Sequence, residues 1–403
     1  MSDHIYIHVP FCLKKCGYCD FYSGTDLALI PDFTAALSQE IRLRAPAREK
    51  HIMGGRPDRS RSSHVKTVYF GGGTPSLLPL DALKAILDEL DAYYVFSETA
   101  EFTIEVNPGC LDKNYLRGLK NMGFNRLSIG VQSFFSEKLS FLGRGHNRGD
   151  AANTVECART AGFDNIGLDL IYGLPGESRQ AWQKDLDTAL TFAPEHLSCY
   201  MLTLEPGTPL DKKYQQGGFS PMSASGQVDL FSFTSGYLSR AGYEHYEISN
   251  FAKGAEFRSR HNSGYWEMAP YTGFGPSAHS LAFKKDDQGK SVPVRSWNLT
   301  DLSRYIHCLS EGGLPVDDSE NISESQQLLE MAMVGLRTTQ GVDINAFDTL
   351  SQKKFTDLYK DLLQTLVSDG LGQFSEGKRQ FLLTRAGWAR LDNIVEKFAD
   401  PLL

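Results

Sequence analysis

The first half of the chain alternates between short β-like runs and helical patterns, and this alternation constrains the fold more than any other feature. The β-like runs are residues 5–11, 66–70, 101–106, 126–131, 165–172 and 196–203. Between them, segments 31–44, 79–91, 112–122, 150–161 and 179–192 carry apolar residues at helical spacing. Asp112 and Asp150 are predicted N-caps, and Gly123 and Gly162 are predicted helix stops. Repeated strand–helix units predict an α/β fold with a parallel sheet.

Residues suited to binding or chemistry fall where successive runs end. In chain order they are Cys12, Gly71-Gly72-Gly73, Glu105 with Asn107, Gln132, and Thr203 with Glu205, and Asp169 lies on the fifth run. Ligands of (β/α) barrels bind at the carboxyl ends of the strands, so this placement favours a barrel. Six units close only about three quarters of an eight-unit barrel. The sequence therefore predicts a partial barrel with one open side.

Three thiols, Cys12, Cys16 and Cys19, lie within eight residues directly after the first run, and the next cysteine is Cys110. Thiolates this close together are typical ligands of zinc or of iron–sulfur clusters. One alternative is a zinc site with His8 as fourth ligand, and another is three unligated thiols. We favour a cubane cluster in which three irons bind these cysteines and the fourth iron is open to a small molecule.

The chain beyond this half divides into further segments. Residues 45–66 are polar, basic and rich in breakers, which predicts an exposed loop or, alternatively, a docking patch for an acidic partner. After a barrel over 1–206, a connecting region is expected over 207–322. From Ser323, helical stripes and two short strands, 371–374 and 380–383 around Gly377, predict a winged-helix-like domain over 323–403.

Charge and composition exclude some classes of function. The net charge is −8, and the last segment has 9 Lys and Arg against 11 Asp and Glu, so no nucleic-acid partner is expected. No apolar run reaches about 18 residues and no signal pattern precedes the first strand. Cluster thiols must stay reduced, which predicts a cytoplasmic location. The scattered cysteines are predicted to be core or incidental thiols: Cys110, Cys157, Cys199 and Cys308.

The CxxxCxxC loop, with Tyr18 before its third cysteine, resembles the radical S-adenosylmethionine (SAM) superfamily. This resemblance implies a (β/α)6 partial barrel, a [4Fe-4S] cluster whose open iron binds SAM, and reductive SAM cleavage to a 5′-deoxyadenosyl radical. It also implies a reductant protein such as flavodoxin or ferredoxin. Four motifs, YIHVPFC at 6–12, YFGGGTP at 69–75, IGVQS at 129–133 and DLIYGLP at 169–175, resemble the HemN-like group, named after oxygen-independent coproporphyrinogen III oxidase.

Matching the motifs residue by residue implies particular roles. Tyr6, Gly72 and Glu105 match residues that contact the cluster-bound SAM. A second SAM is held in the oxidase by residues that match Tyr18, Gly73, Thr74, Gln132, Arg144 and Asp169, with Thr203 nearby. Whether this chain binds a second SAM is left open.

Three features point within this group to the HemW family of haem chaperones. Phe21 stands where the oxidase has a fourth cysteine, and only five residues precede Tyr6. Residues 261–266, His-Asn-Ser-Gly-Tyr-Trp, match the HNxxYW motif of that family, which implies that His261 ligates haem iron. His245 and His279 are weaker candidates, and a hydrogen-bonded structural histidine is the alternative for His261.

The predicted function is therefore haem binding and transfer to an acceptor protein, supported by the cluster and SAM. In the family, acceptors resemble haem-dependent respiratory proteins, which would place the chain peripherally at the membrane. The alternative is oxidative decarboxylation of coproporphyrinogen III, and a third reading is a scaffold that keeps the cluster for stability. Whether the protein is an enzyme is left open.

Overall fold

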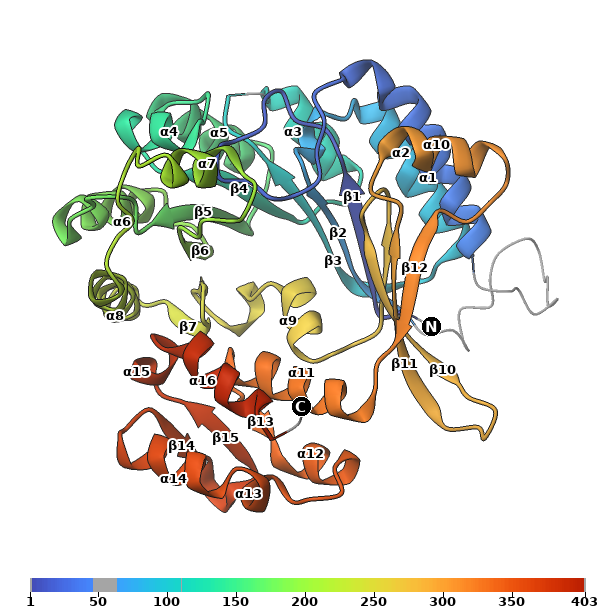
Figure 1. Cartoon of the computed structure of the whole chain (residues 1–403). Coiled ribbons are helices and arrows are strands. Elements are labelled where there is room, and N and C mark those ends of the chain that lie inside the picture. Colours follow the sequence, from blue (N-terminus) through green and yellow to red (C-terminus); the bar gives the residue numbers. More distant parts are fainter. Residues whose placement is uncertain (1, 46–63, 110, 402–403) are drawn as a thin grey trace.

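The computed structural model in Figure 1 describes residues 2–45, 64–109 and 111–401. Its framework is a parallel sheet in which each strand pairs with the next along the chain. The strands are β1 (His4–Val9), β2 (Val65–Gly72), β3 (Phe96–Val106), β4 (Arg126–Gln132), β5 (Ile166–Tyr172) and β6 (His196–Met201). All six predicted strands are confirmed, and they form the wall of a partial barrel.

The helices between the strands cover the outer face of this wall (Figure 1). They are α1 (Ile30–Arg44), α2 (Leu80–Tyr93), α3 (Lys113–Asn121), α4 (Ser136–Leu142), α5 (Arg148–Thr160) and α6 (Arg179–Thr191), with short 3₁₀ turns at Leu27–Leu29 and Pro75–Leu77. Asp112 caps α3 as predicted, but the prediction for Asp150 is wrong. Asn147 is the N-cap of α5, and Asp150 closes a capping box from the third helical position.

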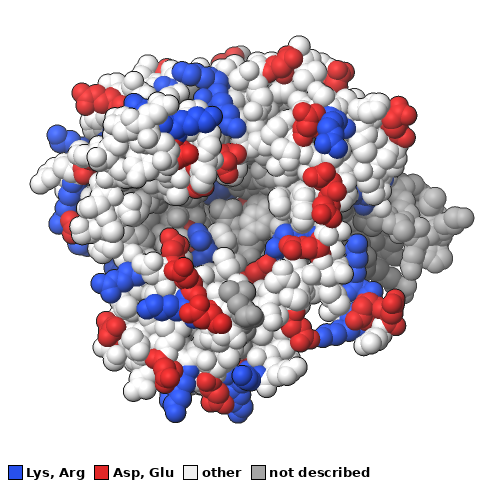
Figure 2. All heavy atoms as spheres, in the orientation of Figure 1, with Lys and Arg blue, Asp and Glu red and all other residues white. Residues whose placement is uncertain are grey.

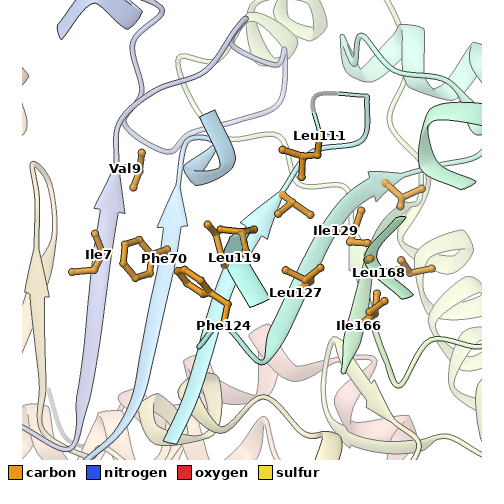
Figure 3. Close-up of a cluster of buried hydrophobic side chains, with 14 of the residues drawn as sticks. Ile7, Val9, Phe70, Leu111, Leu119, Phe124, Leu127, Ile129, Ile166 and Leu168 are labelled. Carbon is orange, nitrogen blue, oxygen red and sulfur yellow. The ribbon is translucent and has the colours of Figure 1, made fainter. Parts of the chain in front are cut away.

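Side-chain alternation along the strands separates an apolar outside from a polar inside. Ile5, Ile7 and Val9 of β1 are fully buried. Figure 3 shows Ile7 beside Phe70 of β2, and Leu127 of β4 beside Ile166 of β5, which are paired across neighbouring strands. Burying a side chain of this size stabilises the fold by roughly 1.5–3 kcal/mol. The alternate residues face the barrel interior and are mostly polar or aromatic, which distinguishes this barrel from one filled by branched apolar residues.

The segment 207–322, predicted as a connecting region, extends the sheet at both edges. β8 pairs with β6 antiparallel, and β9 pairs with β1 parallel, so that twelve strands form one sheet in the order β12-β11-β10-β9-β1-β2-β3-β4-β5-β6-β8-β7. Its elements are α7 (Pro209–Gln215), α8 (Ala224–Arg240), β7 (Glu244–Glu247), β8 (Asn250–Ala252), a 3₁₀ turn (Ala255–Phe257), α9 (Arg260–Trp266), β9 (Tyr271–Phe274), β10 (His279–Lys285), β11 (Ser291–Asn298), α10 (Leu302–Ser310) and β12 (Val316–Asn321).

The last segment is a helical unit around a three-stranded sheet, with a hydrophobic core of its own. It comprises α11 (Glu324–Leu336), β13 (Val342–Asp343), α12 (Ile344–Leu350), α13 (Phe355–Leu358), α14 (Lys360–Ser368), β14 (Gly372–Phe374), a 3₁₀ turn (Glu376–Lys378), β15 (Gln380–Leu383), α15 (Arg385–Trp388) and α16 (Leu391–Ala399). Ser323 begins α11 through a capping box, and the two wing strands are confirmed. The sequence pattern predicts two helices here, near residues 354–369 and 384–398, and the structure divides each of them in two.

This unit packs beneath the barrel, next to α8, β7 and α9 (Figure 1). The amide of Ile248 donates to the carbonyl of Arg337 at 3.0 Å, and the His245 ring meets Trp388 at 4.8 Å. The predicted loop over 45–66 lies outside the described residues except at its ends, where Val65 and Lys66 belong to β2, and Cys110 lies outside them too. None of the described helices is long and apolar enough to cross a membrane.

Candidate functional site

The three cysteines lie in a loop held against the barrel rim by backbone hydrogen bonds. The amide of Cys12 donates to the carbonyl of Gly24 at 2.9 Å, and Gly17 is bonded to Leu142 of α4 and to Leu210 of α7. Cys12, Cys16 and Cys19 are free thiols, each partly exposed. Among the described residues, no group of three or more His, Cys, Asp or Glu side chains converges as a metal site. The cluster ligands therefore remain a prediction.

A chain of hydrogen bonds connects this loop to the ends of three other strands. Thr74 Oγ1 donates to Cys12 Sγ at 3.6 Å and accepts from Asn107 Nδ2 at 2.8 Å. Asn107 Oδ1 accepts from Arg144 Nη2 at 2.5 Å, and Arg144 Nη1 donates to Cys16 Sγ at 3.5 Å. Arg144 also donates to the carbonyl of Gly130 at 2.7 Å. The structure thus brings Thr74 and Arg144, which the motif match places in one group, within hydrogen-bond distance of two of the thiols.

The glycines after β2 bring its backbone close to the first strand and its loop. A Cβ on Gly73 would lie 2.5 Å from the carbonyl oxygen of Phe11, the residue before Cys12. Gly72 has φ +107°, and a Cβ there would lie 2.6 Å from the His8 ring. His8 itself bonds to Tyr6 and to the Tyr22 carbonyl, so its ring is held away from the thiols as part of the wall.

Below the rim, a cluster of aromatic and acidic side chains fills the barrel interior. Tyr69 donates to Glu105 Oε1 at 2.7 Å, and the Tyr69 ring stacks on His261 with centroids 4.9 Å apart. Tyr6 stacks on both rings at 6.2 Å. Burial raises the pKa of Glu105 to about 7, an effect that the Tyr69 hydrogen bond reduces and the nearby Asp169 increases. Tyr6 and Glu105 therefore share one interior face, as the motif match implies.

His261 lies on α9, which closes the amino-terminal end of this interior. The side chain is 1% exposed, and both ring nitrogens have partners: Nδ1 lies 2.7 Å from Thr67 Oγ1 and Nε2 lies 2.9 Å from the Tyr265 hydroxyl. Burial, followed by the proximity of His4 and Arg126, holds the pKa of His261 well below its usual range. In this conformation His261 is a neutral, hydrogen-bonded part of the barrel.

The other predicted residues occupy different positions. Asp169 accepts from Ser128 Oγ at 3.0 Å on the inner wall, and burial raises its pKa. Gln132 ends β4 with a left-handed φ of +63°. Tyr18 lies in the cysteine loop, where burial strongly raises the pKa of its hydroxyl. The Thr203 hydroxyl donates to the Met201 carbonyl and has no other hydrogen-bond partner among the described residues.

The two weaker haem-ligand candidates lie away from this interior cluster. His245 is buried between Phe251, whose ring centroid is 4.1 Å away, and Trp388, and its two nitrogens bond to Ser235 and Ile248. His279 lies exposed on β10. Neither is brought together with His261.

Sequence reasoning missed Arg126 and a buried ion network. Arg126 is 2% exposed inside the barrel, and its Nε has no hydrogen-bond partner among the described residues. Lys138 Nζ bonds to Glu177 and, at 2.6 Å, to Asp185, and we call these three residues the Lys138 triad. The triad joins α4 to α6 and to the loop after β5. Arg126 is the one charged residue of β4, and this was the available signal for it.

The residues around the cysteine loop suit a cluster and its nucleotide ligand. A hydroxyl and a guanidinium donate to two of the thiols, and such donors favour the thiolate form that metals bind. Arg144 Nε is buried without a hydrogen-bond partner within the described chain, so a donor remains available beside Cys16. These hydrogen-bond donors around the cysteines fit the predicted [4Fe-4S] cluster and its SAM ligand.

Family models, curated relatives and a solved structure all relate the chain to radical SAM proteins of the HemN-like group. Residues 6–189 match the model of the radical SAM superfamily, and residues 322–390 match the HemN C-terminal domain. A protein from Synechocystis sp. named heme chaperone HemW is 36% identical over 92% of this chain and 85% of its own. One of the same name from Bacillus subtilis is 34% identical, covering 92% and 93%. The solved structure of Escherichia coli coproporphyrinogen III oxidase (HemN), a radical SAM enzyme, has a TM-score of 0.78 at 24% identity, covering 99% of this chain and 90% of that one.

Proposed function

Because the chain belongs to the radical SAM superfamily and, within it, to the family of the heme chaperone HemW, we propose that it binds haem and passes it to an acceptor protein. The observation that carries the proposal is the likeness to relatives of that name over nearly the whole of both chains, at 34–36% identity. The HNxxYW segment, which such a role would use, is present as helix α9.

Superfamily membership implies a [4Fe-4S] cluster and SAM. We propose Cys12, Cys16 and Cys19 as the cluster ligands. The open iron and the bound nucleotide would supply electron transfer and radical chemistry. For the chain itself, we propose that Tyr6, Gly72 and Glu105 position this SAM.

The residues implied to hold a second SAM are proposed as one group on the rim: Tyr18, Gly73, Thr74, Gln132, Arg144 and Asp169. Thr74 and Arg144 support this proposal best, because each also bonds to a thiol of the cysteine loop. A reductant protein such as flavodoxin or ferredoxin, and an acceptor among respiratory membrane proteins, complete the proposal. The chain would then act in the cytoplasm, peripherally at the membrane.

Ligation of haem iron by His261 is the part of the proposal that the geometry constrains most. Its Nε2 would have to give up the Tyr265 hydroxyl, and the iron would have to enter a packed interior beside Tyr69. Ligation through Nε2 leaves the buried Tyr265 hydroxyl without this partner, which costs about 1–3 kcal/mol. Ligation by His261 thus requires α9 to move away from the barrel, and it must be tested separately from haem binding.

Oxidative decarboxylation of coproporphyrinogen III is the second candidate function, favoured by the rim residues that this chain shares with the HemN-like group. Against it stands Phe21 at the position of the oxidase's fourth cysteine, where the phenyl ring is 67% exposed at the edge of the cysteine loop. We therefore rank haem transfer first.

One anaerobic experiment separates the two functions. The cluster is rebuilt, and haemin titration and coproporphyrinogen III decarboxylation are measured side by side on the same preparation. The proposal predicts stoichiometric haem binding and no vinyl product at turnover rates. Vinyl product formed at such rates would replace the chaperone function with the oxidase function.

His261→Ala and His279→Ala form a matched pair for this titration. If His261 ligates the iron, only its variant changes the haem spectrum, because His279 is an exposed histidine outside the motif. Equal spectra of wild type and His261→Ala would remove His261 from the site and leave haem binding itself intact. Loss of haem binding in the His279 variant would instead move the site to β10.

A further inference from the structure

Helix α9 presents the HNxxYW motif on two different sides. His261 and Tyr265, four residues apart, bond to each other and face the barrel interior. Ser263, Trp266 and Glu267 occupy the other side and line a cleft. The tryptophan of the motif therefore lies in a different environment from its histidine.

The cleft has a volume of about 490 Å³ and lies between the barrel and the C-terminal unit. Its walls are α9 with the turn after it, the β10–β11 hairpin, α11 and the start of α12. The apolar side chains that line it include Trp266, Met268, Leu281, Phe283, Met331 and Val334. This volume is within the range of about 300–1,000 Å³ typical of sites for drug- or cofactor-sized ligands. Figure 2 shows that the molecular surface is hollowed between the barrel and the C-terminal unit.

Three observations mark the cleft as a ligand site rather than a packing gap. Trp266 lines the cleft, and its indole offers a large, flat apolar surface. Met268 adopts a left-handed φ of +52°, which costs a non-glycine residue free energy and is frequent at functional sites. The Phe283 side chain is 50% exposed to solvent at the hairpin. An aromatic, thioether-rich and partly open wall suits a flat, polarizable, apolar molecule.

Charged groups lie at the border of the cleft. Arg258, Glu267 and Asp343 line it, with Arg258 paired to Glu244, and the Arg337 guanidinium lies 4.5 Å from the centre of the Trp266 ring. A ligand with an apolar disc and polar edges can bury the disc and leave its edges among these groups and water. Haem has this shape, with two propionates on one edge, and Met268 and Met331 belong to the class of thioether ligands that bind haem iron in cytochromes.

We propose that the cleft between α9, the β10–β11 hairpin and α11 holds the porphyrin ring of haem, on the side of α9 opposite to His261. The proposal rests on the haem-binding function proposed above and specifies its site. It is the alternative to ligation of the iron by His261, whose ring faces Thr67 and Tyr265 inside the barrel. Haem held there touches both the barrel and the C-terminal unit.

The first test blocks the cleft without removing any polar group. Ala346 is an exposed residue of α12 that lines the cleft, and its neighbour Asn345 is exposed on the same helix but does not line it. Ala346→Trp is expected to weaken haemin binding about tenfold or more, and Asn345→Trp to leave it within about twofold. Equal affinities of the two variants would overturn the cleft proposal. Absence of haem binding by the wild-type protein would instead overturn the proposed function.

A second test locates the porphyrin without relying on affinity. Tin protoporphyrin, bound to the wild-type chain and illuminated in air, converts dissolved dioxygen to singlet oxygen, which oxidises nearby methionines to sulfoxides that mass spectrometry identifies. Met331 lines the cleft, whereas Met333, on the same helix, is 43% exposed and does not line it. We expect sulfoxide at Met331 and Met268 in preference to Met333, and expect Ala346→Trp to abolish this preference. Oxidation that follows exposure alone, with Met333 highest, would overturn the site.

Discussion

Replacing Gly73 by alanine is the perturbation whose consequence the structure specifies best. The new Cβ would lie 2.5 Å from the Phe11 carbonyl oxygen and 2.9 Å from both the Phe11 nitrogen and the Val9 oxygen. All three atoms are backbone, so no side-chain rotation can relieve the contact. The Phe11 carbonyl also accepts the Thr74 amide at 2.7 Å, a bond that its displacement would break.

The expected loss of stability follows from these two effects. Overpacking a close backbone contact costs about 1–3 kcal/mol, and the lost hydrogen bond adds roughly 1 kcal/mol. Gly73→Ala should therefore lower the free energy of unfolding by about 2–4 kcal/mol. Because Phe11 directly precedes Cys12, the same displacement should move the cysteine loop and reduce the iron retained per chain.

Gly17→Ala is the matched control, since it makes the same chemical change within the cysteine loop itself. No atom lies within 4 Å of a Cβ built there, and the residue is not in the left-handed region. Its free energy of unfolding should change by less than about 1 kcal/mol, in the stabilising direction. Urea unfolding followed by tryptophan fluorescence, with iron analysis of the rebuilt protein, measures both variants. Equal losses of stability in the two variants would refute the reasoning.

Three further predictions concern charged residues of the site. Burial raises the pKa of Glu105 from 4.5 to about 7, so between these pH values the folded state binds a proton that the unfolded state does not, and the free energy of unfolding falls as pH rises. Glu105→Gln should remove roughly 3 kcal/mol of this decrease. If the variant keeps the wild-type slope of stability against pH, the slope belongs to another group. Lys138→Met leaves two buried carboxylates without their counter-charge, and should lower the free energy of unfolding in urea by about 3–5 kcal/mol. Lys84→Met, in an exposed ion pair, should lower it by less than about 1 kcal/mol. Similar losses in the two variants would show that the triad contributes no more than a surface pair. Arg144→Lys keeps the charge but lacks the planar fork that bonds Asn107 and Gly130. Calorimetric titration of the rebuilt protein with SAM should therefore show binding at the second site weakened about tenfold, and an unchanged isotherm would separate Arg144 from that site.

Much of the barrel was predictable because its information is local. Period-two strands and helical stripes depend on each segment's own residues, so all six strands were placed, and the wing strands around Gly377 followed from the same reasoning. Helix α4, only seven residues long, carries too little periodicity to be detected. Asp150 was misassigned as an N-cap because Asn147, three residues earlier, competes for that position and captures the amides.

The sequence by itself determined that Cys12 and Thr74 follow the ends of two strands and that Arg144 follows a short helix, because side-chain identity and chain order place them there. Only the tertiary structure decided that these three meet, through hydrogen bonds between residues up to 128 positions apart. It also decided that the HNxxYW helix turns His261 into the barrel and Trp266 toward the C-terminal unit. A motif specifies residue types and spacing, but the face that each residue presents depends on which surfaces the rest of the chain packs against it.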